Sequence, residues 1–317
     1  AAFAACAALL PAPASAQDFP NLKPLTLVVP FAAGSATDNS GRILADTLSE
    51  TLGQKVIVVN RPGAGAAVGL DSVAKSAPDG YNLVMGHIGP MVSAVTLYAK
   101  NLPYDPVRDF EPVTMVGQGV VVLVVNPGMP VNTALEFVDY AKKKGDLSYS
   151  SAGNGSTSHL TGELLKRITG VPLQHIPYKS AGNALTAMLT GEVQVSFLSP
   201  LTAHAQLKAG KVKALAVSSA KRFAGAPEIP SAAEAGIPGM DVRLWFGLFA
   251  PAKTPKSVVA KLNREIGDIL RAPETQETFL KQGVAAAPGT PEELGDWVKT
   301  ELARWTPVIQ AAGIKAD

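Results

Sequence analysis

The chain has 317 residues, a formal net charge of +2 at pH 7 and 17% charged side chains, with no basic run longer than the three residues Lys142–Lys144. Its hydrophobic content of 47% is enough for a sizeable core, and its length fits two domains or one large one. A nucleic-acid interface needs a concentrated basic face, and attachment to a membrane surface needs a polybasic segment. The composition therefore excludes both classes of partner.

The first residues predict an export signal. Ala1–Leu10 is an uncharged apolar run, and Ala14-Ser15-Ala16 has the A-x-A form of a cleavage site. We therefore expect residues 1–16 to be a signal peptide that is cleaved after Ala16. The apolar run is shorter than the roughly 18 residues that a transmembrane helix needs. Cys6, the only cysteine, lies in this segment, so the mature chain has none. An exported chain without cysteine or a second hydrophobic span is expected in the periplasm.

Strands and helices alternate in the next part of the chain, up to about residue 120. This alternation predicts a parallel sheet. The apolar run Val120–Val125, in which all residues but Leu123 are β-branched, predicts a buried strand that passes from one lobe to the next, and Asn126-Pro127-Gly128 ends it. The expected strands are 25–30, 55–60, 81–86 and 111–117, and the expected helices are 36–52, 66–76 and 91–98.

A second alternating set follows. Residues 221–241 form a loop rich in Pro, Gly and Ala, and 242–250 is a second strand that can cross between lobes. We expect an α/β fold of two lobes joined by a hinge, with residues 17–121 and 244–317 in lobe I and 122–243 in lobe II. Ligands in such sheets bind at the carboxyl ends of the strands. The expected helices are 132–144, 156–169, 181–190, 201–209, 255–271, 273–282 and 291–312, and the expected strands are 147–150, 172–176, 193–198 and 212–218.

One local pattern occurs once in each half of the chain. An apolar strand runs into a loop of small residues, and the loop runs into a helix, at Ala32–Asp38 and again at Ser151–His159. Such loops leave backbone N–H groups unpaired at a helix N-terminus, where the helix dipole favours an anion. Each loop alone is also compatible with an ordinary turn. Facing each other across a cleft, the two loops would hold a small carboxylate, which indicates binding rather than catalysis.

Other residues have both a functional and a structural interpretation. His87 follows a strand and can point into the cleft, whereas His159 can simply cap its helix. Tyr178 and Ser180 belong to a third small-residue loop, which is suited to binding or to starting a helix. Asp38 is expected to be a cap or a partner of the helix dipole rather than a catalytic acid.

Catalytic, metal and cofactor sites are not supported by the motifs. The four histidines have no paired metal spacing, and the glycines of residues 60–69 do not fit the dinucleotide fingerprint. No Gly-x-Ser-x-Gly elbow is present, although a secreted hydrolase using Ser156 and His159 stays an alternative. We expect no cofactor, no metal and no catalytic residue.

Several stretches together resemble the Bug or TctC family, the substrate-binding proteins of tripartite tricarboxylate transporters. The resemblance implies a periplasmic type II solute-binding fold that closes on a small organic anion and delivers it to membrane permease subunits. We expect the protein to be a monomer with this transport function. A periplasmic sensor that presents its ligand to a membrane partner is the alternative. The stretches are 27–34, 59–65, 77–81, 104–110, 215–219 and 247–251.

The resemblance also implies a binding site. In the family, one ligand carboxylate lies between the two loops and is held by amides, hydroxyls and ordered water. The implied ligand-binding residues are Phe31, Ala33, Gly34, Ser35 and Asp38 in the first loop, and Ala152, Gly153, Ser156, Thr157 and His159 in the second.

The chain departs from the family at Leu198 and Ser199, where many relatives carry an aspartate. A cleft without that carboxylate is less suited to an amino group and better suited to a second carboxylate, a hydroxyl or an apolar group. Ser180-Ala181 also replaces the usual pair of glycines. The sequence leaves open which carboxylate is bound.

Overall fold

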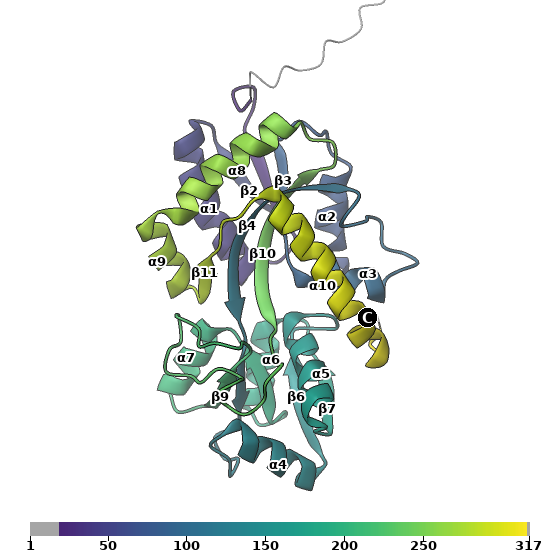
Figure 1. Cartoon of the computed structure of the whole chain (residues 1–317), viewed down its shortest axis with the longest axis vertical. Coiled ribbons are helices and arrows are strands. Elements are labelled where there is room, and N and C mark those ends of the chain that lie inside the picture. The colour runs from purple at the N-terminus through teal and green to yellow at the C-terminus, as the bar shows by residue number, and fades with distance from the viewer. Residues whose placement is uncertain (1–18, 316–317) are drawn as a thin grey trace, which may run out of the picture.

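Two β-sheets, each flanked by helices, form two lobes that lie one above the other in Figure 1. The computed structural model describes residues 19–315. The signal peptide expected at residues 1–16 lies outside this range. The two-lobed α/β architecture expected from the sequence is confirmed.

The sheet of lobe I contains six strands in the order β11-β4-β10-β3-β1-β2. β1 pairs in parallel with β2 and β3, whereas β10 is antiparallel to both β3 and β4. β4 therefore runs in the same direction as β1, β2 and β3, as the alternation predicted. The strands are β1 (Leu25–Val29), β2 (Val56–Asn60), β3 (Asn82–Gly86), β4 (Phe110–Val120), β10 (Arg243–Pro251) and β11 (Val284–Ala286).

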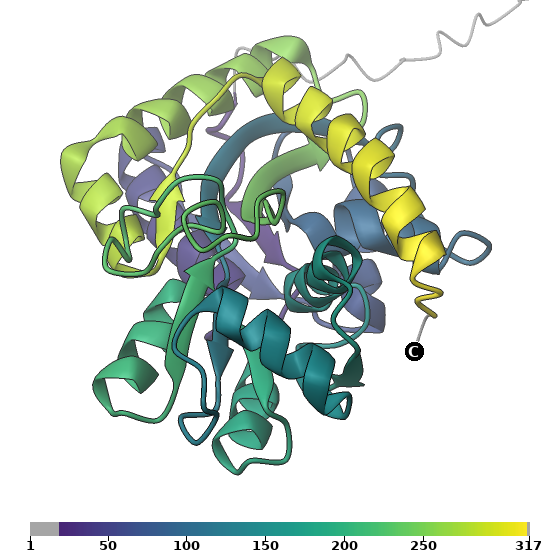
Figure 2. The same cartoon turned by 60° about the horizontal axis from the view of Figure 1, so that its bottom comes forward.

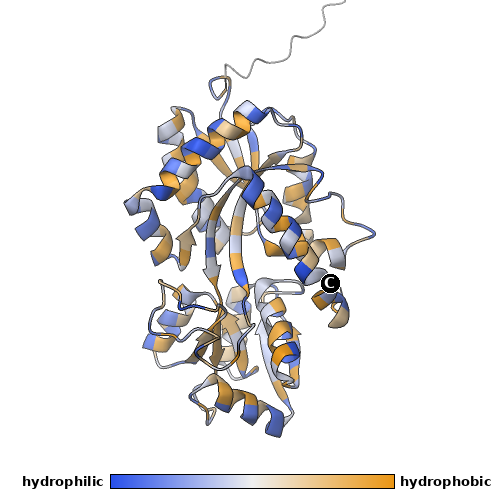
Figure 3. Cartoon of the chain, viewed as in Figure 1, coloured by the Kyte–Doolittle hydropathy of each residue, from blue (hydrophilic) through white to orange (hydrophobic). Residues whose placement is uncertain are grey.

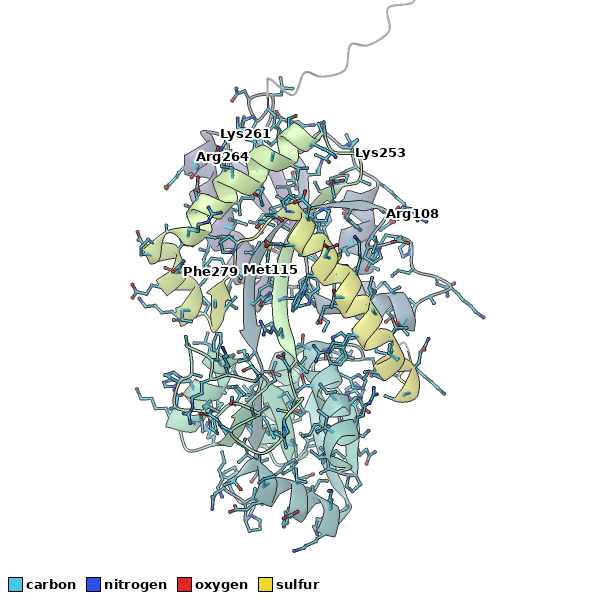
Figure 4. The ribbon with its side chains drawn as sticks, in the orientation of Figure 1. Arg108, Met115, Lys253, Lys261, Arg264 and Phe279 are labelled. Carbon is cyan, nitrogen blue, oxygen red and sulfur yellow. The ribbon has the colours of Figure 1, made fainter. Side chains whose placement is uncertain are left out.

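Helices cover both faces of this sheet, because successive residues of a strand point to opposite faces. Leu27 of β1 belongs to one core cluster and Val28 to the other. Phe279 of α9 and Met115 of β4, both labelled in Figure 4, likewise belong to different core clusters. The helices are α1 (Ala36–Leu52), α2 (Ala67–Ala74), α3 (Ala94–Leu97), α8 (Lys256–Arg271), α9 (Pro273–Lys281) and α10 (Pro291–Ala311), with a 3₁₀ turn η1 (Ala64–Ala66) and a π-helical turn η2 (Gly89–Ser93).

The sheet of lobe II contains five strands in the order β7-β6-β8-β5-β9. β6 pairs in parallel with β7 and β8, and β5 is antiparallel to β8 and β9. Figure 3 shows hydrophobic colours on much of this sheet, while α8 and α10 alternate between hydrophilic and hydrophobic. The elements are β5 (Val122–Val125), α4 (Ala134–Lys144), β6 (Leu147–Ser151), α5 (Thr157–Thr169), β7 (Leu173–Pro177), α6 (Ala181–Leu189), β8 (Val195–Leu198), α7 (Pro200–Lys208) and β9 (Lys213–Val217).

The lobes are joined where the chain passes between the sheets. Val121 alone separates the end of β4 from the start of β5, and β10 returns the chain to lobe I. Val122 pairs with Leu198 and Val217, at the ends of β8 and β9, and Val120 pairs with Arg243. The crossing points therefore lie at the carboxyl edges of both sheets. Consequently the loops after β1, β2 and β3 face those after β6, β7 and β8.

A helix also connects the lobes. α10 crosses lobe I diagonally, and its C-terminal end approaches α5 in both Figure 1 and Figure 2. Leu160 of α5 is fully buried and packs in the same cluster as Trp305 and Ile309 of α10. Lobe II is thus connected to lobe I by its packing against α10 as well as by the crossing strands.

The structure differs from the predicted elements in two places. β11 was not predicted, because a strand of three residues is too short to show a period. The helix expected at 91–98 begins earlier, at Gly89, as the π-helical turn η2 and continues as α3. In the lobe II sheet the parallel strands are accompanied by β5, whose direction is reversed because it enters from lobe I.

Candidate functional site

The first loop, after β1, turns sharply and starts α1. Ser35 is the N-cap, and its hydroxyl accepts a hydrogen bond from the Asp38 N–H at 3.2 Å. Gly34 has a φ of +80°, a conformation that glycine adopts without strain. Its N–H donates to Asp38 Oδ2 at 2.8 Å. Ala33 and Gly34 are exposed, so the tip of the loop is presented to solvent.

Asp38 is the centre of a hydrogen-bonded network behind this loop. Its side chain is almost completely buried and accepts from Asn60 Nδ2 at 2.8 Å and from Arg42 Nε at 3.0 Å. Burial alone would raise the pKa of Asp38, but the hydrogen bonds from Arg42, Asn60 and Gly34 outweigh it and hold the pKa below its usual range. Asn60 also donates to the Phe31 carbonyl at 3.0 Å. The Asp38 carboxylate thus fixes the shape of the loop.

The second loop, after β6, repeats this arrangement in lobe II. Ser156 is the N-cap of α5, and its hydroxyl accepts from the His159 N–H at 3.3 Å. Gly155 has a φ of +72°, and its N–H donates to His159 Nδ1 at 3.2 Å. His159 thus occupies the position in the second loop that Asp38 occupies in the first. The pattern recognised in the sequence corresponds to a shared hydrogen-bond geometry.

His159 is buried and lies face to face with His175, with the ring centroids 3.6 Å apart and the planes at 14°. Burial, and to a smaller extent the neighbouring His175 and Lys166, lower the pKa of His159 to about 3. The ring is therefore neutral at pH 7, so one of its nitrogens carries no proton. The Gly155 N–H, which donates to Nδ1, identifies that nitrogen as Nδ1. Tyr149, below the stack, donates to Glu163 Oε1 at 2.8 Å.

His87, after β3, lies beside the first loop. Its ring stacks on Phe31 with a centroid distance of 4.4 Å, and its Nδ1 accepts from the Gly89 N–H at 2.9 Å. Desolvation by the surrounding protein lowers the pKa of His87 to about 3. The ring is a neutral support for Phe31 and carries no positive charge for an anion.

Two amides of the second loop are used within the loop. The Ala152 N–H donates to Ser158 Oγ at 3.1 Å, and the Gly153 N–H donates to Ser151 Oγ at 3.2 Å. Thr157, the first residue of α5, is buried next to the capping serine. The loop is therefore internally braced, and the helix N-terminus at Ser156–Ser158 is its part oriented for an anion.

The remaining predicted residues lie at two neighbouring helix starts. The hydroxyls of Ser180 and Ser199 cap α6 and α7, accepting from Asn183 N–H at 3.2 Å and Thr202 N–H at 3.3 Å. Together with Ser35 and Ser156, they give four serine-capped helices that begin at the carboxyl ends of strands. All four helix starts lie on the edges of the sheets that face the other lobe.

Four further side chains have defined surroundings. The Tyr178 hydroxyl donates to Glu192 Oε1 at 2.7 Å. Leu198 is buried and packs in the apolar cluster that contains Val122. Trp245 is fully buried and packs in the core, and Phe246 is buried in the same way.

The sequence analysis missed two residues that organise the loops, Asn60 and Ser158. Asn60 ends a predicted strand, and a polar residue at the carboxyl end of a parallel strand is a usable signal. Ser158 offered no such signal. Within residues 19–315, no group of three His, Cys, Asp or Glu side chains could hold a metal ion. In the same part of the chain, no helix is long and apolar enough to cross a membrane.

Comparison with known proteins identifies the family. The model of the tripartite tricarboxylate transporter family receptor matches residues 41–314. A protein from Pseudomonas sp. strain P51, described as a UPF0065 protein in the tcbD-tcbE intergenic region, is 38% identical over 301 residues, which cover 94% of this chain and 89% of that protein. BugT from Bordetella pertussis is 34% identical over 305 residues, covering 96% and 93%.

Solved structures agree with this assignment. Rpa4515 from R. palustris, with adipate, superposes with a TM-score of 0.86 at 33% identity, covering 94% of this chain and 99% of that one. MatC from Rhodopseudomonas palustris, with bound malate, gives a TM-score of 0.80 at 35% identity, covering 91% and 99%. The chain therefore belongs to the TctC family of tripartite tricarboxylate transporter receptors, which are periplasmic solute-binding proteins.

Proposed function

We propose that this protein captures a small organic carboxylate in the periplasm and delivers it to the membrane permease of a tripartite tricarboxylate-type transporter. The observation that carries the proposal is the pair of serine-capped loops, one at the facing edge of each sheet. Rpa4515 with adipate and MatC with malate support a carboxylate as the ligand class. The first 16 residues are proposed to direct export.

The ligand would be held without catalysis and without a cofactor. Helix N-termini and hydroxyls supply partial positive charge and hydrogen-bond donors, which suit a carboxylate. Closure of the lobes would exclude water and strengthen these bonds. We assign residues 17–121 and 244–317 to lobe I and 122–243 to lobe II, with Arg243 at the boundary as the first residue of β10. The ligand is assigned to the interface between the lobes. The proposed ligand-binding residues are those predicted from the sequence except Leu198, whose side chain is buried in the apolar cluster of lobe II. Asp38 and His159 shape the loops.

The geometry argues against the hydrolase alternative. A serine nucleophile needs its hydroxyl hydrogen-bonded to the imidazole of the base. The Ser156 hydroxyl instead accepts from the backbone N–H of His159, and the His159 Nδ1 accepts from Gly155. A binding role fits this arrangement better than acyl transfer.

A thermal-shift screen with malate, adipate, succinate and citrate tests the proposal. A ligand present at 100 times its Kd stabilises the folded state by about 2.7 kcal/mol. We expect at least one of these acids to raise the melting temperature, and calorimetry to give a single site. If neither these nor other organic acids bind, and a carboxylate ester is turned over, the binding-protein assignment of the site is wrong.

A further inference from the structure

Gly155, in the second loop, lies directly against lobe I. A Cβ atom added at Gly155 would lie 2.6 Å from Leu97 Cδ1 and 3.0 Å from Ser93 Cβ. Ser93 ends η2 and Leu97 ends α3, and Figure 1 shows α3 next to the upper part of α5. The loop that we propose to hold the carboxylate therefore also forms a contact between the lobes.

The Ser93 hydroxyl is the unusual part of this contact. Ser93 is 1% exposed, and its Oγ has no hydrogen-bond partner among residues 19–315. Oγ lies 3.6 Å from the position of the added Cβ at Gly155, so the loop of lobe II covers it. A buried hydroxyl without a partner costs free energy, because water would otherwise satisfy it. Separation of the lobes would uncover Ser93 and let water hydrate the hydroxyl.

We infer that Ser93 sets the affinity for ligand by penalising lobe closure, without contacting the ligand. This inference rests on the proposed function, because it assumes that the carboxylate is bound in the closed state. The penalty applies only when Gly155 covers Ser93, so it shifts the empty protein toward the open state. Leu97 has the opposite effect, since its apolar contact with the same loop favours closure.

A residue that acts on closure alone has a distinctive signature. The apparent Kd of every ligand is the intrinsic Kd divided by the fraction of protein that can close. A change at Ser93 therefore multiplies the Kd of all ligands by one common factor. A residue that contacts the ligand would instead change the ratio between ligands that differ in length or substituents.

The first test compares Ser93→Ala with the unaltered protein by calorimetry, using succinate, malate and adipate. We expect Ser93→Ala to tighten the binding of each acid that binds by about fivefold or more, by the same factor throughout. Leu97→Ala should weaken all of them by a common factor. Weaker or unchanged binding in Ser93→Ala, or factors that differ between the acids, would overturn the inference.

Ser40→Ala is the matched control. Ser40 is also 1% exposed, and its Oγ also lacks a partner within the described residues. It lies in α1, one turn before the core residue Leu44, and it is not part of the contact at Gly155. Removing this hydroxyl is expected to change the free energy of unfolding and to leave the Kd unchanged.

A second measurement needs no ligand and separates this inference from the proposed function. Small-angle scattering of the empty protein should give a smaller radius of gyration for Ser93→Ala than for Ser40→Ala. If none of the acids binds to any variant, the proposed function fails while the scattering result still decides the role of Ser93. Identical scattering profiles of the empty Ser93→Ala and Ser40→Ala proteins would refute that role.

Discussion

Asp38 and His159 hold equivalent places in the two lobes. Each lies three residues after a capping serine, and each accepts the N–H of the glycine before that serine, at 2.8 Å for Asp38 and 3.2 Å for His159. One loop is thus fixed by a buried carboxylate and the other by a neutral imidazole. The two sides of the proposed site should therefore respond differently to substitution and to pH.

Asp38→Asn should destabilise the first loop. The substitution removes the charge that pairs with Arg42 and replaces an acceptor of the Gly34 N–H with an amide that can present donors. Arg42 is half exposed, so its charge stays hydrated in the variant, and the cost is that of losing hydrogen bonds to a charged group, about 1.5–3 kcal/mol. Urea denaturation measures the loss. Asp46→Asn, at an exposed position of the same helix, is the control and should stay within about 0.5 kcal/mol of the parent protein.

The same carboxyl gives a pH dependence of stability. Because the pKa of Asp38 is lowered in the folded state, its contribution is present above the unfolded pKa of 3.8 and is lost as the pH falls through the lower folded value. Asp38→Asn should therefore reduce the acid-induced loss of unfolding free energy below pH 4. If the unfolding free energy of the variant falls below pH 4 as steeply as that of the parent protein, the network described at Asp38 is contradicted.

The two buried imidazoles predict a second acid-induced loss of stability, which begins at a higher pH than the loss due to Asp38. The folded-state pKa values of His87 and His159 are about 3, against 6.5 in the unfolded chain, so the unfolded state binds more protons between these values. The free energy of unfolding should therefore fall as the pH is lowered from 6.5 toward 3. Urea denaturation at a series of pH values should show a shallower slope in His159→Gln, whereas the exposed His204→Gln should match the parent.

Negative charge on either loop should abolish tight binding. Gly34→Asp and Ser156→Asp each place a carboxylate beside the proposed ligand carboxylate, so we expect the Kd measured by calorimetry to rise at least tenfold, which is about 1.4 kcal/mol. Gly210→Asp is the control, because Gly210 also has a positive φ and open space around it but lies at the end of α7. Unchanged affinity in both folded loop variants would show that the ligand does not bind at these loops.

Selectivity should favour acids without an α-amino group. Leu198 and Ser199 offer no counter-charge, and burying an unpaired ammonium costs several kcal/mol. Calorimetry is expected to give tighter binding of succinate than of aspartate. Leu198 is buried in the apolar cluster of lobe II, so Ser199→Asp is the variant that should shift preference toward the amine. A preference of the parent protein for aspartate would reject this prediction.

Many features of this protein could be predicted from the sequence because they depend on short-range interactions. A serine followed three residues later by the N–H that it caps identifies a helix start, and Ser35, Ser156, Ser180 and Ser199 all follow this rule. Apolar runs rich in β-branched residues, such as Val122–Val125, identify buried strands. The two loops and the two crossing strands could therefore be predicted from the sequence alone.

Only the tertiary structure decided which distant residues meet. The insertion of β10 between β3 and β4, the hydrogen bond from Asn60 to Asp38, the stacking of His159 on His175 and the contact of Gly155 with Ser93 all join separate segments. Local propensities carry no information about such pairs. Strand register and the packing of one lobe on the other determine them, because buried surface must be filled and buried polar groups must find partners.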